Sequence, residues 1–181
     1  MKPNTPFFIF DVESIGLHGE GFAVAGGVYL ANGAAQYEFA YSCPMSEAKG
    51  VEEDRQWVKE NVPILEITHR MPIAMRDEFW KQWTEAKSKY PDITMAVECG
   101  WPVEARFLAA CINDFPEGRR WEGPYPLQEI ASLMTAAGME PMANYPRTAS
   151  ELPAHNPLTD ARLSARLLST ALVKLQLLNA R

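Results

Sequence analysis

The feature that most constrains this chain is a run of four apolar residues, Phe7 to Phe10, that ends in two acids, Asp11 and Glu13. The run follows a proline and precedes turn-forming residues, so it predicts a strand buried on both faces. Because side chains alternate along a strand, Asp11 and Glu13 point to the same face. Two such carboxylates repel each other and need a compensating cation or strong hydrogen bonds. A divalent metal ion meets that need; the alternative for an isolated Asp-x-Glu is a solvated turn.

Length and composition predict one globular domain that covers residues 1–181. The chain is 47% hydrophobic and 22% charged, and it is long enough to bury a sizeable core. We expect neither a signal peptide nor a membrane span, because Asp11 interrupts the apolar start and no later stretch could cross a bilayer. Cys43, Cys99 and Cys111 are widely spaced and include no Cys-x-x-Cys pair, which predicts a reducing cytoplasmic location.

The formal net charge of −6 argues against a protein that holds long duplexes by neutralising many phosphates. It leaves nucleic-acid enzymes open. Carboxylates that bind metal ions make a protein more acidic, and the metals then supply the positive field that phosphate oxygens need.

The chain begins with a predicted three-stranded meander. After the first strand, residues 22–30 are rich in β-forming side chains, the Asn-Gly pair at 32–33 predicts a hairpin, and residues 36–42 form the returning strand. The paired Gly26 and Gly27 predict a bulge or a close approach of another backbone.

The rest of the chain is predicted to be mainly helical. Periodicity predicts helices at residues 51–62, 72–90, 127–137 and 158–178, another that Pro102 opens, and a strand at 93–98. Residues 139–157, with four prolines, predict a long loop of the kind that is often functional. The order predicts an α/β fold, in which an antiparallel meander and parallel strands form one mixed β-sheet flanked by α-helices.

Two aromatic segments have two interpretations each. Trp80 and Trp83 recur at helical spacing, and they either pack in the core or stack on bases. Residues 119–121, Arg-Arg-Trp, either meet a nucleic acid or form a solvated loop. We predict the core for the first pair and a solvated loop for the trio.

Further acids and a histidine follow the later elements. Glu98 ends the strand at 93–98, Glu104 lies in the first turn of the next helix, His155 precedes the last helix, and Asp160 lies in its first turn. Acids suit the first turns of helices because of the helix dipole, so each residue alone also has a purely structural explanation.

Taken together, these residues resemble the DEDDh 3′–5′ exonucleases, an RNase H-like family that includes proofreading domains, RNase T and oligoribonuclease. The family motif Asp-x-Glu-Thr-x-Gly-Leu is matched by residues 11–17, with serine for threonine. The motif His-x-x-x-x-Asp is matched by residues 155–160, followed by a leucine-rich helix. Residues 57–62 also resemble a segment of small bacterial and phage 3′–5′ exoribonucleases.

The middle motif departs from the family pattern. Where the family has an aspartate after an apolar residue, this chain has Glu104 after Val103. The customary asparagine nearby is replaced by residues 99–102, Cys-Gly-Trp-Pro. Glutamate is still a hard oxygen ligand for Mg²⁺ or Mn²⁺, but its extra methylene changes its reach. Glu98 is the alternative ligand.

The resemblance implies a metal-dependent 3′–5′ exonuclease that acts on single-stranded ends, with RNA favoured over DNA, and releases nucleoside 5′-monophosphates. It implies two divalent ions, Mg²⁺ or Mn²⁺, held by four carboxylates: Asp11, Glu13, Glu104 and Asp160. His155 would be the general base.

For the substrate, the resemblance implies that Ser14, Ile15 and Gly16 line the terminal nucleotide and that Leu17 packs against its base. It also makes a homodimer plausible. Two other functions fit the residues. One is a catalytically weak, nuclease-like module that binds nucleic acid or protein, and the other is a structural metal-binding domain, which leaves His155 unexplained.

Overall fold

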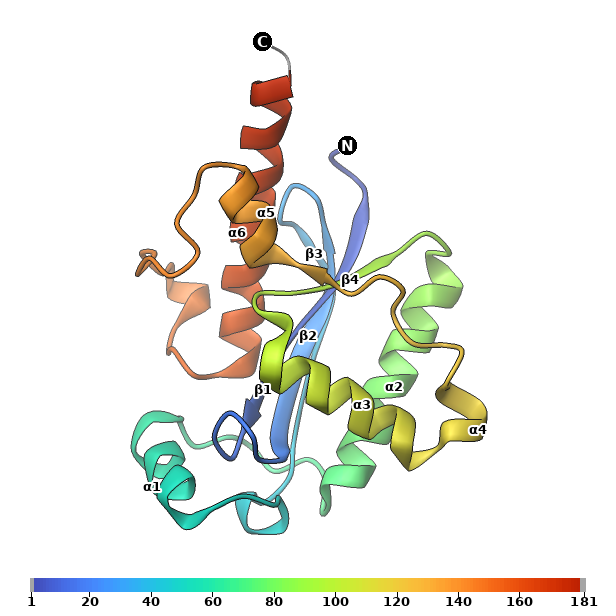
Figure 1. Cartoon of the computed structure of the whole chain (residues 1–181), viewed down its shortest axis with the longest axis vertical. Coiled ribbons are helices and arrows are strands. Elements are labelled where there is room, and N and C mark those ends of the chain that lie inside the picture. The colour runs from blue at the N-terminus through green and yellow to red at the C-terminus, as the bar shows by residue number, and fades with distance from the viewer. Residues whose placement is uncertain (1, 180–181) are drawn as a thin grey trace.

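The computed structural model describes residues 2–179 and has a five-stranded sheet at its centre, with strand order β3-β2-β1-β4-β5 (Figure 1). The strands are β1 (Pro6–Ser14), β2 (Gly21–Leu30), β3 (Ala35–Ser42), β4 (Thr94–Val97) and β5 (Gln128–Glu129). The first three form an antiparallel meander, whereas β4 runs parallel to β1 and β5 parallel to β4. The predicted α/β fold with a mixed sheet is confirmed.

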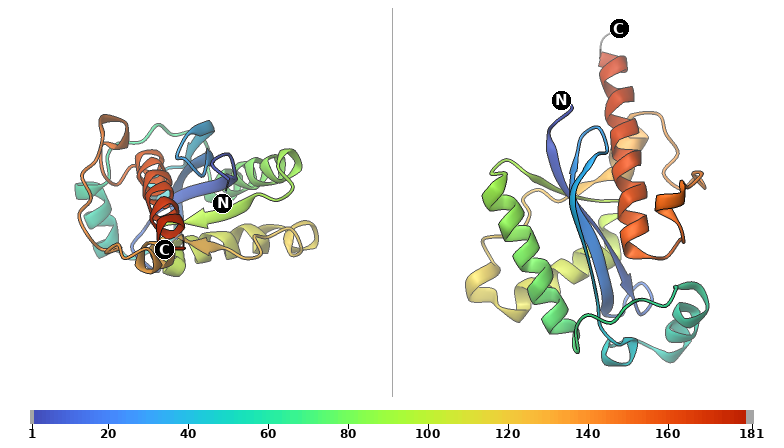
Figure 2. Two further views of the ribbon diagram at one scale, coloured as in Figure 1. Left: turned by 90° about the horizontal axis from the view of Figure 1, so that it is seen from above. Right: turned by 180° about the vertical axis from the view of Figure 1, so that it is seen from behind.

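Helices cover both faces of this sheet. They are α1 (Glu52–Asn61), α2 (Pro72–Lys89), α3 (Ala105–Asp114), α4 (Pro116–Arg119), α5 (Ile130–Ala136) and α6 (Pro157–Asn179). Short 3₁₀ turns lie at Met45–Glu47 and Ala149–Glu151. Helices α2 and α6 lie on opposite sides of the sheet (Figure 2), and α1 lies beyond the end at which β1 finishes (Figure 1).

Two cores result from the alternation of side chains along β1. Phe8 and Phe10 join the core under α2 and α3, and Phe7 and Ile9 join the core under α5 and α6. Because β1 is buried on both faces, all four residues of the run from Phe7 to Phe10 are apolar.

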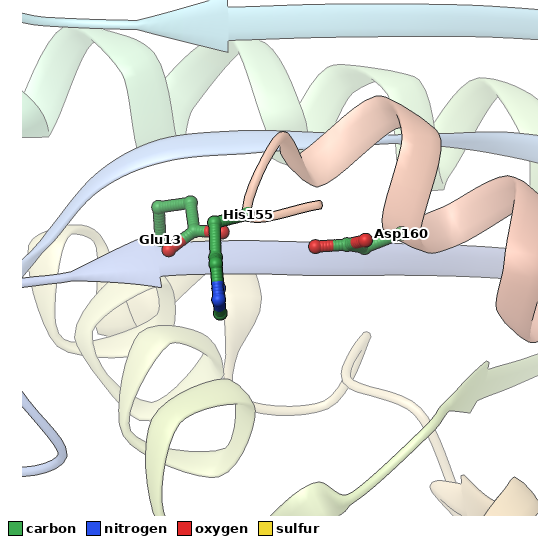
Figure 3. Close-up of side chains that lie close together, drawn as sticks. All are labelled: Glu13, His155 and Asp160. Carbon is green, nitrogen blue, oxygen red and sulfur yellow. The ribbon is translucent and has the colours of Figure 1, made fainter. Parts of the chain in front are cut away.

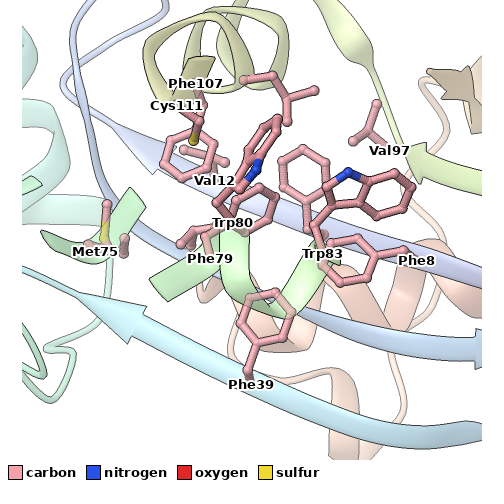
Figure 4. Close-up of a cluster of buried hydrophobic side chains, with 14 of the residues drawn as sticks. Phe8, Val12, Phe39, Met75, Phe79, Trp80, Trp83, Val97, Phe107 and Cys111 are labelled. Carbon is pink, nitrogen blue, oxygen red and sulfur yellow. The ribbon is translucent and has the colours of Figure 1, made fainter. Parts of the chain in front are cut away.

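The tryptophans of α2 lie in the first of these cores (Figure 4). Trp80 and Trp83 are 5% and 2% exposed, and the Trp83 ring packs edge-on against Phe8 with 5.5 Å between ring centroids. The core interpretation of these two residues is confirmed.

In the trio at 119–121, Arg119 is buried, whereas the sequence predicts a solvated loop. Its guanidinium pairs with Asp77 at 2.5 Å and lies over the Trp80 ring at 5.4 Å. The solvated-loop prediction is thus wrong for Arg119. Trp121 is exposed, with Arg120 over its ring.

Two helix starts also differ from the prediction. The helix expected from residue 127 begins at Ile130, because Gln128 and Glu129 instead pair with the end of β4 as β5. Pro102 does not open α3. It lies in a π-helical turn, Gly100–Glu104, in which Trp101 has extended backbone angles, and α3 starts after this turn.

The glycine pair in β2 permits a close approach rather than a bulge. A Cβ at Gly26 would lie 2.2 Å from the Ile9 carbonyl oxygen, and one at Gly27 would lie 2.1 Å from the Tyr37 carbonyl oxygen. The register with both neighbouring strands continues through the pair. Any side chain here would push the central strands apart.

Within residues 2–179, no helix is both long enough and apolar enough to cross a membrane. The three cysteines are unpaired, and Cys43 and Cys111 are buried.

Candidate metal centre

Asp11 and Glu13 lie where β1 extends beyond its partner β4. The last β1–β4 pair is Ile9 with Ala96, so the next residues of β1 have no β4 strand beside them. The Gly100–Glu104 turn occupies this side instead, and the carboxylate of Glu104 interacts with the backbone of Val12. The departure of β4 thus brings the predicted middle acid, Glu104, to the end of β1.

The start of α6 places His155 and Asp160 opposite this strand end. Asn156 caps the helix, because its side-chain oxygen accepts a hydrogen bond from the Leu158 N–H at 3.0 Å. His155, just before the cap, has a left-handed backbone with φ +58°, which is uncommon for a residue with a side chain. Asp160 follows in the first turn, and its N–H donates to the Asn156 carbonyl at 3.0 Å.

Three potential ligand groups converge here. A carboxylate oxygen of Glu13, one of Asp160 and a ring nitrogen of His155 all lie within 4.8 Å of one another (Figure 3). Glu13 is 9% exposed, whereas His155 is exposed to solvent. Carboxylate oxygens are the ligands that Mg²⁺ and Mn²⁺ prefer, so the donor set fits such an ion.

Five acids form one electrostatic cluster. Burial, followed by the charges of Glu104, Asp160, Glu13 and Glu98, raises the pKa of Asp11 well above its usual range. Burial and the charges of Asp160 and Glu104 raise the pKa of Glu13 to about 8. Burial raises the pKa of Glu104 to about 7, with Glu98 adding to the effect. This excess of negative charge is what a divalent cation would relieve.

Glu98, the alternative ligand, belongs to the same cluster. Its carboxylate accepts a hydrogen bond from the Ser164 hydroxyl at 3.0 Å, which lowers a pKa that burial raises. The charges of both Glu98 and Glu104 act on Asp11.

Two partners of the cluster were not predicted from the sequence. Arg147 forms an ion pair with Asp160 and lowers a pKa that burial raises. Ser164 follows Asp160 by four residues, so helical spacing on α6 could have indicated it. Arg147 comes from an aperiodic loop and carries no comparable signal.

A cavity of about 320 Å³ adjoins the cluster. Its wall contains Glu13 and three of the predicted substrate-binding residues, Ser14, Gly16 and Leu17. Ile15 does not line it, because its side chain is fully buried in the core, so only its backbone could contact a ligand. Gly16 has φ +66°, a left-handed conformation that suits glycine.

Solved structures show a related arrangement of elements. The chain matches exonuclease I from Methylocaldum szegediense with a TM-score of 0.60, 13% identity, and coverage of 95% of this chain and 41% of that one. It matches cell-death related nuclease 4 (CRN-4) with a TM-score of 0.53, 13% identity, and coverage of 94% and 64%.

The chain therefore shares with these two proteins the arrangement of its mixed sheet and flanking helices. This likeness concerns the fold alone, since the identity is low. The chain spans less than two thirds of the length of either protein. Comparisons with protein-family models and with curated protein sequences find no match.

Proposed function

We propose that this protein is a metal-dependent 3′–5′ exonuclease that removes nucleoside 5′-monophosphates from single-stranded RNA. The observation that supports this most strongly is that Glu13 and Asp160 lie close together with His155 at the end of β1, with Asp11 and Glu104 coupled electrostatically to these acids. The nuclease names of the two structural neighbours agree with the proposal. The preference for RNA over DNA rests on the resemblance of residues 57–62 to small exoribonucleases.

In this proposal Asp11, Glu13, Glu104 and Asp160 hold two divalent ions, Mg²⁺ or Mn²⁺. Such ions polarise a phosphodiester, lower the pKa of water and stabilise the leaving oxygen. The charges of the four other acids all act on Asp11, which supports its inclusion among the ligands. Glu104, whose pKa is about 7 without a cation, must lose its proton before it can bind one.

In this proposal His155 is the general base. Its ring nitrogen lies within 4.8 Å of oxygens on Glu13 and Asp160, and its ring meets the Trp57 ring edge-on with 5.3 Å between centroids. An imidazole can take a proton from water near neutral pH. Its exposed place on a loop lets substrate reach it.

The test is a time course on 5′-labelled single-stranded RNA and on DNA of the same sequence, with Mn²⁺, Mg²⁺ or EDTA. We expect a metal-dependent ladder that shortens from the 3′ end, faster on RNA, and that Asp11→Asn abolishes. Glu53→Gln removes an exposed acid from α1 and serves as the matched control. A ladder that persists in EDTA or in Asp11→Asn would overturn the proposal.

The second candidate is a nuclease-like module that binds without efficient cleavage. Glu104 in place of the family aspartate, together with the Arg147–Asp160 ion pair, favours it. If it is correct, wild-type activity is negligible and Glu104→Asp raises it. In a competent enzyme, Glu104→Asp brings no gain.

A further inference from the structure

Part of the wall of the cavity beside Glu13 is formed by residues that lie outside the candidate metal centre. Besides β1 and the loop after it, the cavity is lined by Asp54 and Trp57 of α1. These two residues lie one helical turn apart and therefore share a face of the helix. At about 320 Å³, the cavity lies at the lower end of the range of small-ligand sites, which suits a single nucleotide.

The cavity offers apolar surfaces to a flat ring. Trp57 is 49% exposed and Leu17 is 64% exposed, although both are large and apolar. The Trp57 ring also contacts His155, so the aromatic surface continues to the edge of the acid cluster. Aromatic side chains bind unpaired bases by stacking, whatever the base. A terminal base placed here would leave its phosphate on the side of Glu13.

Asp54 provides a group that can distinguish bases. A Cβ at Gly16 would lie 2.1 Å from its carboxylate oxygen, so the carboxylate packs directly against the loop backbone next to Leu17. Within residues 2–179, no hydrogen bond or ion pair engages this carboxylate. An ionised carboxylate only accepts hydrogen bonds.

We propose that Asp54, in the wall of the cavity that would hold the 3′-terminal base, is a specificity determinant that selects cytosine and adenine, which carry an amino group at position 4 or 6, over uracil, thymine and guanine, which carry a carbonyl there. The inference rests on the proposed exonuclease function. The amino group donates to the carboxylate, whereas the O4 carbonyl of uracil presents an oxygen to the same oxygens and is repelled.

The sharpest test compares two RNA oligonucleotides that differ only in a 3′-terminal cytidine or uridine. These bases have the same shape and differ in the amino or carbonyl group at position 4. We expect wild-type protein with Mn²⁺ to release the terminal cytidylate on the order of tenfold faster, at subsaturating substrate, as one hydrogen bond to a charged group allows.

In Asp54→Asn, the ratio of cytidylate to uridylate release should fall to about one, because the carboxamide can both donate and accept. Glu53→Gln, the same change of charge on the neighbouring exposed residue, should keep the wild-type ratio. No preference in the wild type, or an unchanged ratio in Asp54→Asn, would overturn the inference.

Substitutions of Trp57 should affect the KM for both oligonucleotides rather than the ratio between them. Trp57→Ala should raise the KM for both oligonucleotides by the same factor, on the order of tenfold, and Trp57→Phe should restore most of the loss. Trp121→Ala, a change of an exposed tryptophan outside the cavity lining, is the control. A Trp57→Ala variant with an unchanged KM would show that the base does not bind here.

A binding measurement separates this inference from the proposed function. Equilibrium dialysis of 5′-CMP and 5′-UMP against the protein with Mn²⁺ requires no cleavage. If neither oligonucleotide is cut but CMP binds more tightly than UMP, and Asp54→Asn removes the difference, the cavity assignment stands while the exonuclease proposal fails. Equal binding of the two nucleotides to the wild type would refute the assignment.

Discussion

The guanidinium of Arg147 forms an ion pair with the carboxylate of Asp160, whose oxygen lies within 4.8 Å of ligand atoms on Glu13 and His155. Arg147 also donates to the Glu151 carbonyl at 2.8 Å within the same long loop, so its guanidinium joins this loop to the start of α6. The pair offsets part of the negative charge of the acid cluster. It also places a positive charge where a divalent cation would bind, so the two compete for Asp160.

Arg147→Gln should therefore raise the affinity for Mn²⁺, by about three- to tenfold, because it removes a neighbouring positive charge. The metal-free protein should unfold at a lower temperature, since Asp160 loses its partner. Calorimetric titration and thermal unfolding measure the two effects. Arg166→Gln, which breaks the ion pair between α6 and Glu151 of the Ala149–Glu151 turn, should leave Mn²⁺ affinity unchanged. Weaker Mn²⁺ binding in Arg147→Gln would contradict the competition.

Metal-free protein should lose stability as the pH rises from about 4.5 to 8. Burial and like charges raise the pKa of Glu13 from its usual 4.5 to about 8, and burial raises that of Glu104 to about 7. The folded chain thus keeps protons that the unfolded chain has released, so stability falls between about pH 4.5 and 8.

In EDTA, we expect the unfolding temperature to drop by several degrees over this range, by roughly 5 °C. Glu13→Gln should flatten the drop because it removes one titrating group, and Mn²⁺ should oppose it. Equal slopes in the wild type and in Glu13→Gln would show that Glu13 keeps its usual pKa.

His155→Ala should cut turnover by about 10²- to 10⁴-fold, the usual contribution of a general base. Mn²⁺ affinity should change by less than about twofold, because the four carboxylates still hold the ions. Single-turnover kinetics and calorimetry check the two effects. A parallel loss of Mn²⁺ affinity would instead make His155 a ligand, as its distance from Glu13 and Asp160 allows.

Arg76 should be a stability determinant that is independent of the metal. It is 6% exposed and pairs with Asp114 at 2.5 Å and with Glu20 at 2.6 Å. Arg76→Ala leaves two partly buried acids without their cation, so the free energy of unfolding should fall by about 3–5 kcal/mol. Urea unfolding measures this. The exposed Arg70, changed to alanine, should cost less than about 0.5 kcal/mol.

Local sequence signals were enough to predict the elements on which the site is built. The apolar run that ends in Asp11 and Glu13 has the length and alternation of a buried strand, and β1 occupies that place. The Asn-Gly hairpin and the leucine-rich last helix are equally local signals, and both elements form where predicted.

Features that depend on distant partners could not be predicted in this way. The two residues of β5 are polar and too few to show a period, and their strand conformation comes from pairing with β4. Arg119 is charged, which predicts exposure to solvent, yet it is buried against Asp77 and Trp80 of α2. Arg147 lies in a loop and Asp54 lies in α1, and tertiary packing sets the position of both segments.

Calorimetric titration of metal-free protein with Mn²⁺ shows whether the end of β1 and the start of α6 bind divalent metal together. We expect saturable binding of two ions per chain in the wild type and in Glu53→Gln, and loss of at least one ion in folded Asp11→Asn. Folded wild-type protein that binds no Mn²⁺, or Asp11→Asn that binds two ions with unchanged affinity, would contradict this expectation.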